Sequence, residues 1–233
     1  MAALVIPPVK RPAKHPRRQP IVLPPQLDKS CVLCLLPLRD SKWYDYSGKG
    51  NHGAIIGATW VGKGRRGPAL YFDGIDDYVD CGVHPSLNFG SGDFSVEVWI
   101  WGGSMSGNRG IVGKWSGSEG WALITATNGR PFFKVNDGTS QVAIVGNIVL
   151  FDIQRWVHVV AVYAGSEAKI KIFEDGSVKE KTITPLGNYD VTNDLWVGAV
   201  RNYYPINGML DEVRIFNRAL TADEIRALYE LGR

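Results

Sequence analysis

The chain has 233 residues with 26 Lys and Arg against 23 Asp and Glu, a formal net charge of +3. This length is sufficient for one domain with a sizeable core, so disulfide staples are not required, and three cysteines are too few to provide them. No apolar run approaches the roughly 20 residues needed to span a bilayer. We therefore expect no membrane insertion.

Positive charge is concentrated in residues 1–30, a proline-rich basic N-terminal arm. This arm holds six basic residues and one acidic residue, a net of +5, whereas the remainder carries a net of −2. It also contains seven of the thirteen prolines, which fix φ and favour extended polyproline II. At roughly 3.1 Å per residue the arm reaches about 90 Å. We expect it to attach the domain of residues 31–233 to a partner.

Two apolar patches in the arm are flanked by proline and separated by basic residues, a pattern suited to lying along a neighbouring sheet edge or groove. The residues expected to contact a partner are Leu4, Val5, Ile6, Arg11, Arg17, Arg18, Ile21, Val22 and Leu23. Arm basicity without interleaved aromatic residues argues against nucleic acid binding. The run Ala2–Ile6 precedes the charges, the reverse of a secretory signal, so we expect no export through such a signal.

Hydrophobic periodicity in the rest of the chain is close to two. In Phe94–Trp101, Phe, Val, Val and Ile alternate with Ser, Glu, Trp and Trp, which predicts a strand covered on both faces. Similar strands are expected at Cys31–Leu36, Ala69–Phe72, Trp121–Ala126, Trp156–Tyr163, Ala168–Phe173, Leu195–Ala199 and Met209–Phe216. Glycine-containing turn signals separate them. Many short strands predict an all-β, two-sheet antiparallel sandwich.

One short C-terminal helix is expected. Thr221 and Glu224 form a capping box, in which each side chain accepts a hydrogen bond from the other residue's backbone N–H. Ile225, Leu228 and Tyr229 then form an apolar stripe. We expect this helix to close one edge or end of the sandwich.

Cys31 and Cys34 have the spacing of a zinc or redox pair. A zinc site requires a second pair of ligands at matching spacing, and the four histidines are scattered singly. We therefore favour small apolar residues within a first strand.

Six stretches resemble the laminin-G-like, concanavalin A-like jelly-roll superfamily, in the order typical of that family. They are Asp45–Gly53, Leu70–Val79, Phe94–Trp99, Trp156–Tyr163, Leu195–Gly198 and Asn207–Leu220. The resemblance covers about residues 31–231 and implies a jelly roll of two curved antiparallel sheets that binds carbohydrate or protein. Two departures are Trp101, where family members often have a polar residue, and the arm.

The resemblance also implies a structural calcium ion. Its ligands would be Asp45, Asn51, the Gly53 carbonyl and Asp211, in keeping with the preference of calcium for six to eight oxygen ligands. The alternative is that Asp45–Asn51 is only a turn, in which the side chains satisfy local backbone groups.

A second acidic stretch contains Asp73, Asp76, Asp77 and Asp80. It lacks the full calcium-loop pattern, and the resemblance implies a hairpin turn that runs into a strand. We expect Asp73 and Gly74 to have a structural role.

Aromatic residues are abundant, with eight Trp and nine Tyr. The resemblance assigns Trp99 and Trp156 to packing. The residues expected to bind a ligand are Trp101, Trp115, Tyr203 and Tyr204. Of these, Trp115 and the two tyrosines lie in glycine- or asparagine-rich stretches, which we expect to be exposed loops, although edge packing is the alternative.

Catalysis has little support in the sequence. A glycosidase of this shape needs two carboxylates placed to flank a glycosidic bond. Glu97 has no acidic residue two or four positions further on, and Asp211 and Glu212 are adjacent, which in a regular strand directs them to opposite faces. No esterase, phosphate-loop or metalloprotease motif is present in the sequence. We expect no enzymatic activity.

A lectin-like domain behind a basic arm, without a secretory signal, resembles structural proteins of tailed bacteriophages. The sequence therefore predicts a virion component, assembled in the host cytoplasm as capsid decoration or a tail-associated protein. Its expected partners are capsid or tail subunits, further copies of itself and a host-surface glycan. The alternative is a secreted or cell-surface carbohydrate-binding or adhesion module.

Overall fold

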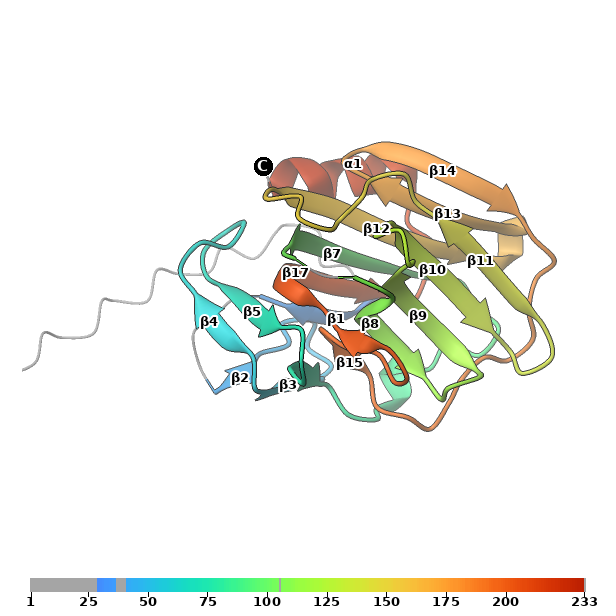
Figure 1. Cartoon of the computed structure of the whole chain (residues 1–233). Coiled ribbons are helices and arrows are strands. Elements are labelled where there is room, and N and C mark those ends of the chain that lie inside the picture. Colours follow the sequence, from blue (N-terminus) through green and yellow to red (C-terminus); the bar gives the residue numbers. More distant parts are fainter. Residues whose placement is uncertain (1–28, 37–40, 105, 233) are drawn as a thin grey trace, which may run out of the picture.

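The structure, a computed structural model, describes residues 29–36, 41–104 and 106–232, and the predicted partner contacts of the arm lie outside them. Two sheets pack face to face in a jelly-roll sandwich (Figure 1). Sheet A has the order β14 (Ser177–Thr182), β13 (Lys169–Glu174), β12 (Trp156–Ala164), β7 (Phe94–Gly102), β17 (Asn207–Phe216), β5 (Ala69–Asp73) and β4 (Thr59–Val61), and β1 (Cys31–Leu35) also pairs with β17. Its pairings are antiparallel.

Sheet B supplies the second layer. Its order is β11 (Gln141–Val145), β10 (Pro131–Asn136), β9 (Gly120–Thr125), β8 (Arg109–Trp115), β15 (Trp196–Val197), β6 (Tyr78–Asp80), β3 (Gly53–Ile56) and β2 (Lys42–Trp43). The short strand β16 (Tyr204–Pro205) adds to β8 in parallel. Single 3₁₀ turns occur at Pro85–Leu87 and Gly165–Glu167.

The main core lies between the sheets and confirms the predicted alternation. Phe94, Val96, Val98 and Ile100 of β7 belong to this core. The intervening residues of β7 therefore face the outer side of sheet A, where Trp99 is also buried. The all-β sandwich prediction is correct. Among the described residues, no helix has the length and apolarity needed to cross a membrane.

The structure contains strands that the hydrophobic pattern did not reveal. β8 has glycine at two positions, and Gly110 and Gly113 approach the backbone of residues 199–200 and the side chain of Val200 so closely that a Cβ would clash. β14 is exposed along its whole length and carries Lys and Glu, as expected of an edge strand that must not pair with another chain. β14 lacks an apolar alternation because neither of its faces is buried, and β8 lacks one because glycine is required where residues 199–200 approach it.

The turn after Asp73 leads into a strand as predicted, but it does not form a hairpin. β5 belongs to sheet A and β6 to sheet B, so the turn between them carries the chain from one layer to the other. Gly74 has a φ of 84°, and a Cβ there would lie 2.8 Å from the Cβ of Asn207, so the tight turn favours glycine.

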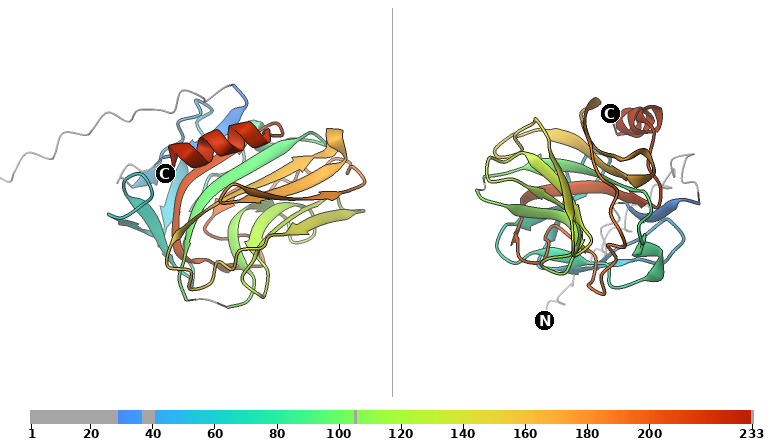
Figure 2. Two further views of the ribbon diagram at one scale, coloured as in Figure 1. Left: turned by 90° about the horizontal axis from the view of Figure 1, so that it is seen from above. Right: turned by 90° about the vertical axis from the view of Figure 1, so that its right-hand side faces the viewer.

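The helix α1 (Ala222–Leu231) covers part of the outer face of sheet A, as the view from above shows (Figure 2, left). The capping box between Thr221 and Glu224 is present as predicted. Ile225 and Leu228 pack with Cys31, Cys34 and other residues of sheet A, including Val160 and Phe216. The helix therefore covers a face of the sandwich, instead of closing an edge or end as expected from the sequence.

A bulge in β17 overturns the expectation that Asp211 and Glu212 point to opposite faces. Glu212 has a φ of 52°, and the register with β7 shifts between Asp211 and Arg214. The extra residue brings both carboxylates to the outer side of sheet A. Leu210 and Val213 on either side remain in the core.

Buried charges form a network on this outer side. The Arg214 guanidinium donates from Nη1 to both carboxylate oxygens of Glu97 at 3.0 Å and from Nη2 to Glu212. His158 Nε2 lies 3.0 Å from Glu97 Oε1. Burial raises the pKa of Glu97, but Arg214 and His158 outweigh burial and hold that pKa below its ordinary value. The network joins β7, β12 and β17.

Removal of Arg214 should destabilise the fold strongly, because Glu97 and Glu212 would keep buried charges without their partner. We expect Arg214→Met to cost about 3–5 kcal/mol of unfolding free energy, measured by urea unfolding. The control is Lys169→Met, which removes an exposed ion pair with Glu180 and should change the midpoint little. Equal midpoints for the two variants would contradict the structural role of the network.

Candidate functional site

Two of the predicted ligand-binding aromatics meet on the outer face of sheet B, around Lys134 of β10. The Lys134 ammonium nitrogen lies 3.6 Å from the centroid of the Trp115 ring and 4.9 Å from that of Tyr203. It also donates a hydrogen bond of 2.6 Å to the Tyr203 hydroxyl. We call Trp115, Lys134 and Tyr203 the lysine–aromatic cluster.

The strand register explains how this cluster forms. Lys134 is paired with Ala122 of β9, which is in turn paired with Gly113 of β8. Small side chains on two neighbouring strands leave space above the sheet, so a long lysine and a tryptophan can lie across it. Val200 also packs in this outer cluster.

Trp115 was expected in an exposed loop, and this expectation is wrong. It is the last residue of β8 and only 4% exposed, because Lys134 covers its ring. Tyr203 is half-buried. Sequence periodicity could not place Trp115 in a strand, because the two glycines of β8 interrupt the apolar alternation that would predict one.

Tyr204 is the exposed member of the predicted set, with 70% of its surface accessible. It pairs with Arg109 of β8, whose guanidinium carbon lies 5.4 Å from the centroid of the Tyr204 ring. The same guanidinium donates to the carbonyls of Gly74 and Pro205 at 3.0 and 3.2 Å. Tyr204 is therefore presented to solvent on a fixed support.

Trp101 lies elsewhere. It stands near the end of β7, paired with Trp156 and Met209 in sheet A. Because it follows the core residue Ile100, it points to the outer side of sheet A, away from the lysine–aromatic cluster. The structure thus groups Trp115 with Tyr203 and separates Trp101 from them.

Of the residues proposed for calcium, Asp45 and Asn51 are hydrogen-bonded to each other, whereas Asp211 has other partners. The Asp45 carboxylate accepts from the backbone N–H groups of Cys34, Ser47 and Asn51, each at 2.9 Å. The Asn51 amide nitrogen donates to the Val32 carbonyl at 2.7 Å, while its Oδ1 atom is buried without a hydrogen-bond partner in the structure. These bonds tie the glycine-rich turn to β1.

Asp211 is held by different neighbours. Its carboxylate accepts from the backbone N–H groups of Arg65 at 2.7 Å and Glu212 at 2.8 Å. Burial, and next the charge of Glu212, raise the pKa of Asp211 to about 7. Gly53 is buried at the start of β3, paired with Trp43. Calcium binding by Asp45, Asn51, Gly53 and Asp211 remains a prediction.

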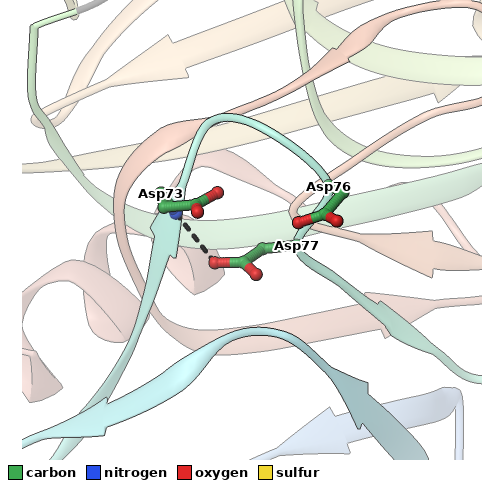
Figure 3. Close-up of side chains that lie close together, drawn as sticks. All are labelled: Asp73, Asp76 and Asp77. Carbon is green, nitrogen blue, oxygen red and sulfur yellow. Dashed lines mark hydrogen bonds between the residues drawn. The ribbon is translucent and has the colours of Figure 1, made fainter.

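Three carboxylates also lie together in the turn between β5 and β6 (Figure 3). One oxygen from each of Asp73, Asp76 and Asp77 lies within 4.8 Å of the others. Asp77 Oδ2 accepts from the Asp73 backbone N–H at 2.8 Å, and Asp73 Oδ1 accepts from that of Ile75 at 2.8 Å. Burial raises the pKa of Asp77. These bonds give Asp73 and Asp77 a role in holding the turn, in agreement with the structural role expected for Asp73.

Cys31 and Cys34 pack as apolar residues. Both are buried in β1 and belong to the cluster beneath α1, together with Leu36 and Leu220. The preferred interpretation from the sequence is therefore confirmed.

Comparison with known proteins defines the class. Residues 73–226, well over half of the chain, match the sequence profile of the concanavalin A-like lectin/glucanases superfamily. The chain belongs to this superfamily. No curated protein matches the chain.

Solved structures with the same fold include clostridial binding domains. The binding domain of Paraclostridial Mosquitocidal Protein 1 has a TM-score of 0.72 and 19% identity, over 88% of this chain and 52% of that one. The binding domain of botulinum neurotoxin DC with rat synaptotagmin II has a TM-score of 0.69 and 15% identity, over 88% and 52%. The same domain in complex with SialylT has a TM-score of 0.65 and 14% identity, over 89% of this chain and 52% of that one. The chain thus spans about half of each of these structures.

A chelation experiment tests the calcium prediction. A cation bound only by the folded state stabilises it by about 2.7 kcal/mol at a hundredfold excess over Kd. EDTA should therefore lower the Tm of the wild type, and Asp211→Ala should remove this difference. A melting curve unaffected by EDTA, with no metal found by elemental analysis, would exclude the site.

Proposed function

We propose that this chain is a non-enzymatic, lectin-like module that recognises a glycan or protein on a surface. The observation that carries the proposal is the grouping of Trp115, Lys134 and Tyr203 on the outer face of sheet B, followed directly in the chain by the exposed ring of Tyr204. Aromatic rings offer apolar faces to sugar rings and rigid anchors to proteins. Their support on paired strands keeps them in position before a ligand arrives.

The related solved structures support recognition as the use of this scaffold. The binding domain of botulinum neurotoxin DC was solved in complex with rat synaptotagmin II and, separately, with SialylT. Because these structures are only 14–15% identical to this chain, the likeness shows the fold alone. The proposed function rests on the residues of this chain. A sandwich of this shape offers extended outer faces and loop rims on which different ligand contacts can be placed.

The buried carboxylates of sheet A are not placed for glycoside hydrolysis. Glu97 and Glu212 do meet through Arg214, a juxtaposition that the sequence alone did not predict, but they are 0% and 4% exposed. Asp211 is also buried, with backbone donors on its carboxylate. A glycosidase requires two carboxyl groups that reach a substrate from opposite sides of the scissile bond. These carboxylates are arranged for packing.

We further propose that the module belongs to a virion, as capsid decoration or a tail-associated protein, with the arm docked to neighbouring subunits. Ser30, at the beginning of the described residues, is bonded to the domain: its carbonyl accepts from Asn217 N–H at 2.9 Å and its hydroxyl from Arg218 at 2.9 Å. Ser30 therefore lies beside the segment between β17 and α1. Basic and apolar residues of the arm suit docking to acidic and apolar surfaces of other subunits.

Recognition should depend on Tyr204. We expect Tyr204→Ala to weaken binding to a glycan-array or cell-surface target by more than about 1 kcal/mol, roughly fivefold in Kd, because a true aromatic anchor is lost. Its melting curve should not change, since the ring is exposed. Val178→Ala, which trims an exposed apolar residue of β14, is the control. Unchanged binding, or release of products from polysaccharides by the wild type, would contradict the proposal.

Docking should depend on the arm. Deletion of residues 1–28 retains Ser30 and every described strand, so we expect the Tm to stay constant while incorporation into particles is lost. Mass spectrometry of purified virions and co-sedimentation with particles measure this. Raised salt should weaken docking only in part, because it screens charges but not apolar contacts. If the truncated chain is still incorporated into particles normally, the arm acts only as a linker. If the full chain is absent from purified virions, the result favours a cellular adhesion module.

A further inference from the structure

Lys134 differs from the other buried lysine of the described chain. The ammonium group of Lys114 donates to Asn88, and the carboxylates of Asp190 and Asp194 act to raise its pKa against the larger effect of burial. Lys134 has no carboxylate within 4.0 Å among the described residues, although only 6% of its surface is exposed. Its neighbours are two aromatic rings and the Tyr203 hydroxyl.

A buried cation without an anion is unfavourable. Burial lowers the pKa of Lys134 to about 8, and no charged group contributes to the shift. The residues paired with Lys134 on β9 and β11 are Ala122 and Ala143, which are uncharged. The guanidinium of Arg201, two residues before Tyr203 in the chain, lies over the ring of Trp196. The local environment therefore disfavours the charged form of the amine.

The amine also has unused donor capacity. An ammonium carries three N–H groups, and the Tyr203 hydroxyl accepts one of them. The Trp115 ring attracts the charge through its face but forms no conventional hydrogen bond. An oxygen ligand that carries a negative charge would supply both the hydrogen bond and the charge that the protein itself does not provide.

We propose that the lysine–aromatic cluster is a subsite for the carboxylate of an acidic sugar, with Lys134 as the residue that binds the charge. This inference rests on the proposed recognition function and names its ligand class. One ammonium matches the single charge of a carboxylate, whereas phosphate sites typically combine several cations, arginine forks or backbone N–H groups. The ring of Tyr203, which is half-buried, keeps part of its surface exposed beside Lys134 and suits contact with the C–H surface of a sugar ring.

The proposal predicts a pH dependence with a defined sign. The pKa of Lys134 in the folded state, about 8, lies below its ordinary value of 10.5. Burial of the protonated amine therefore lowers the free energy of unfolding by its full amount below about pH 8, and by progressively less as the pH rises towards 10.5. Lys134→Met should therefore be more stable than the wild type below pH 8, with a difference that disappears at high pH. Binding of the carboxylate should weaken above pH 8, as the amine loses its proton.

The experiment uses the full chain, labelled at lysine side chains for NMR and titrated at pH 7 with glucuronate, its methyl ester and glucose 6-sulfate. We expect glucuronate to raise the pKa of Lys134 by about one unit or more, as an opposite charge at contact does. The uncharged ester should leave it unchanged. Lys134→Met should lose glucuronate binding by at least about tenfold, whereas Lys179→Met, on exposed β14, should bind as the wild type does.

Each outcome decides one of the two proposals. If glucuronate leaves the Lys134 resonance and pKa unchanged, or if Lys134→Met binds it normally, the subsite is refuted, even when array glycans bind elsewhere on the domain. A response to glucose 6-sulfate without a response to glucuronate also refutes the carboxylate assignment. If glucuronate binds at Lys134 while no surface glycan or protein target is found, the subsite stands and the wider recognition function falls.

Discussion

The buried ion pair between Glu97 and Arg214 is the constraint around which sheet A is organised. It joins the central strands β7 and β17, and two bonds of 3.0 Å fix their relative position. Charges can remain buried there only while every partner is present, since an unpaired charge in this environment is costly. The bulge at Glu212 satisfies this condition, because it adds a second carboxylate to Arg214 without moving Val213 out of the core.

This constraint also decides where function can lie. The outer side of sheet A is occupied by the ion network, by α1 and by the stacked rings of Trp99 and Tyr229, whose centroids are 5.7 Å apart. Recognition is therefore proposed for the outer side of sheet B and its rim. There the strands carry Trp115, Lys134 and the neighbouring tyrosines, and no helix of the described chain covers them.

Two of the buried cations, Arg214 and Lys134, illustrate the difference between a charge with a structural role and one with the proposed functional role. Arg214 meets two carboxylates from its own fold, so its pKa rises despite burial. Burial lowers the pKa of Lys134, and its neighbours, two aromatic rings and a hydroxyl, provide no charge that offsets this effect. In the first arrangement the charge is paired without a ligand. The second leaves a charge and donors unmatched, which is the physical basis of the proposed subsite.

The sequence by itself determined the sandwich, most core strands and the cap of α1, because period-two alternation and capping boxes are local patterns that one element can reveal. It also identified Tyr203 and Tyr204 as candidates for recognition. Only the tertiary structure decided that Trp115 is covered by Lys134, that Asp211 and Glu212 share a face, and that the chain changes sheets after Asp73. These features depend on a bulge, on glycine-rich strands and on register between distant segments, and such pairings leave no periodic signal along the chain.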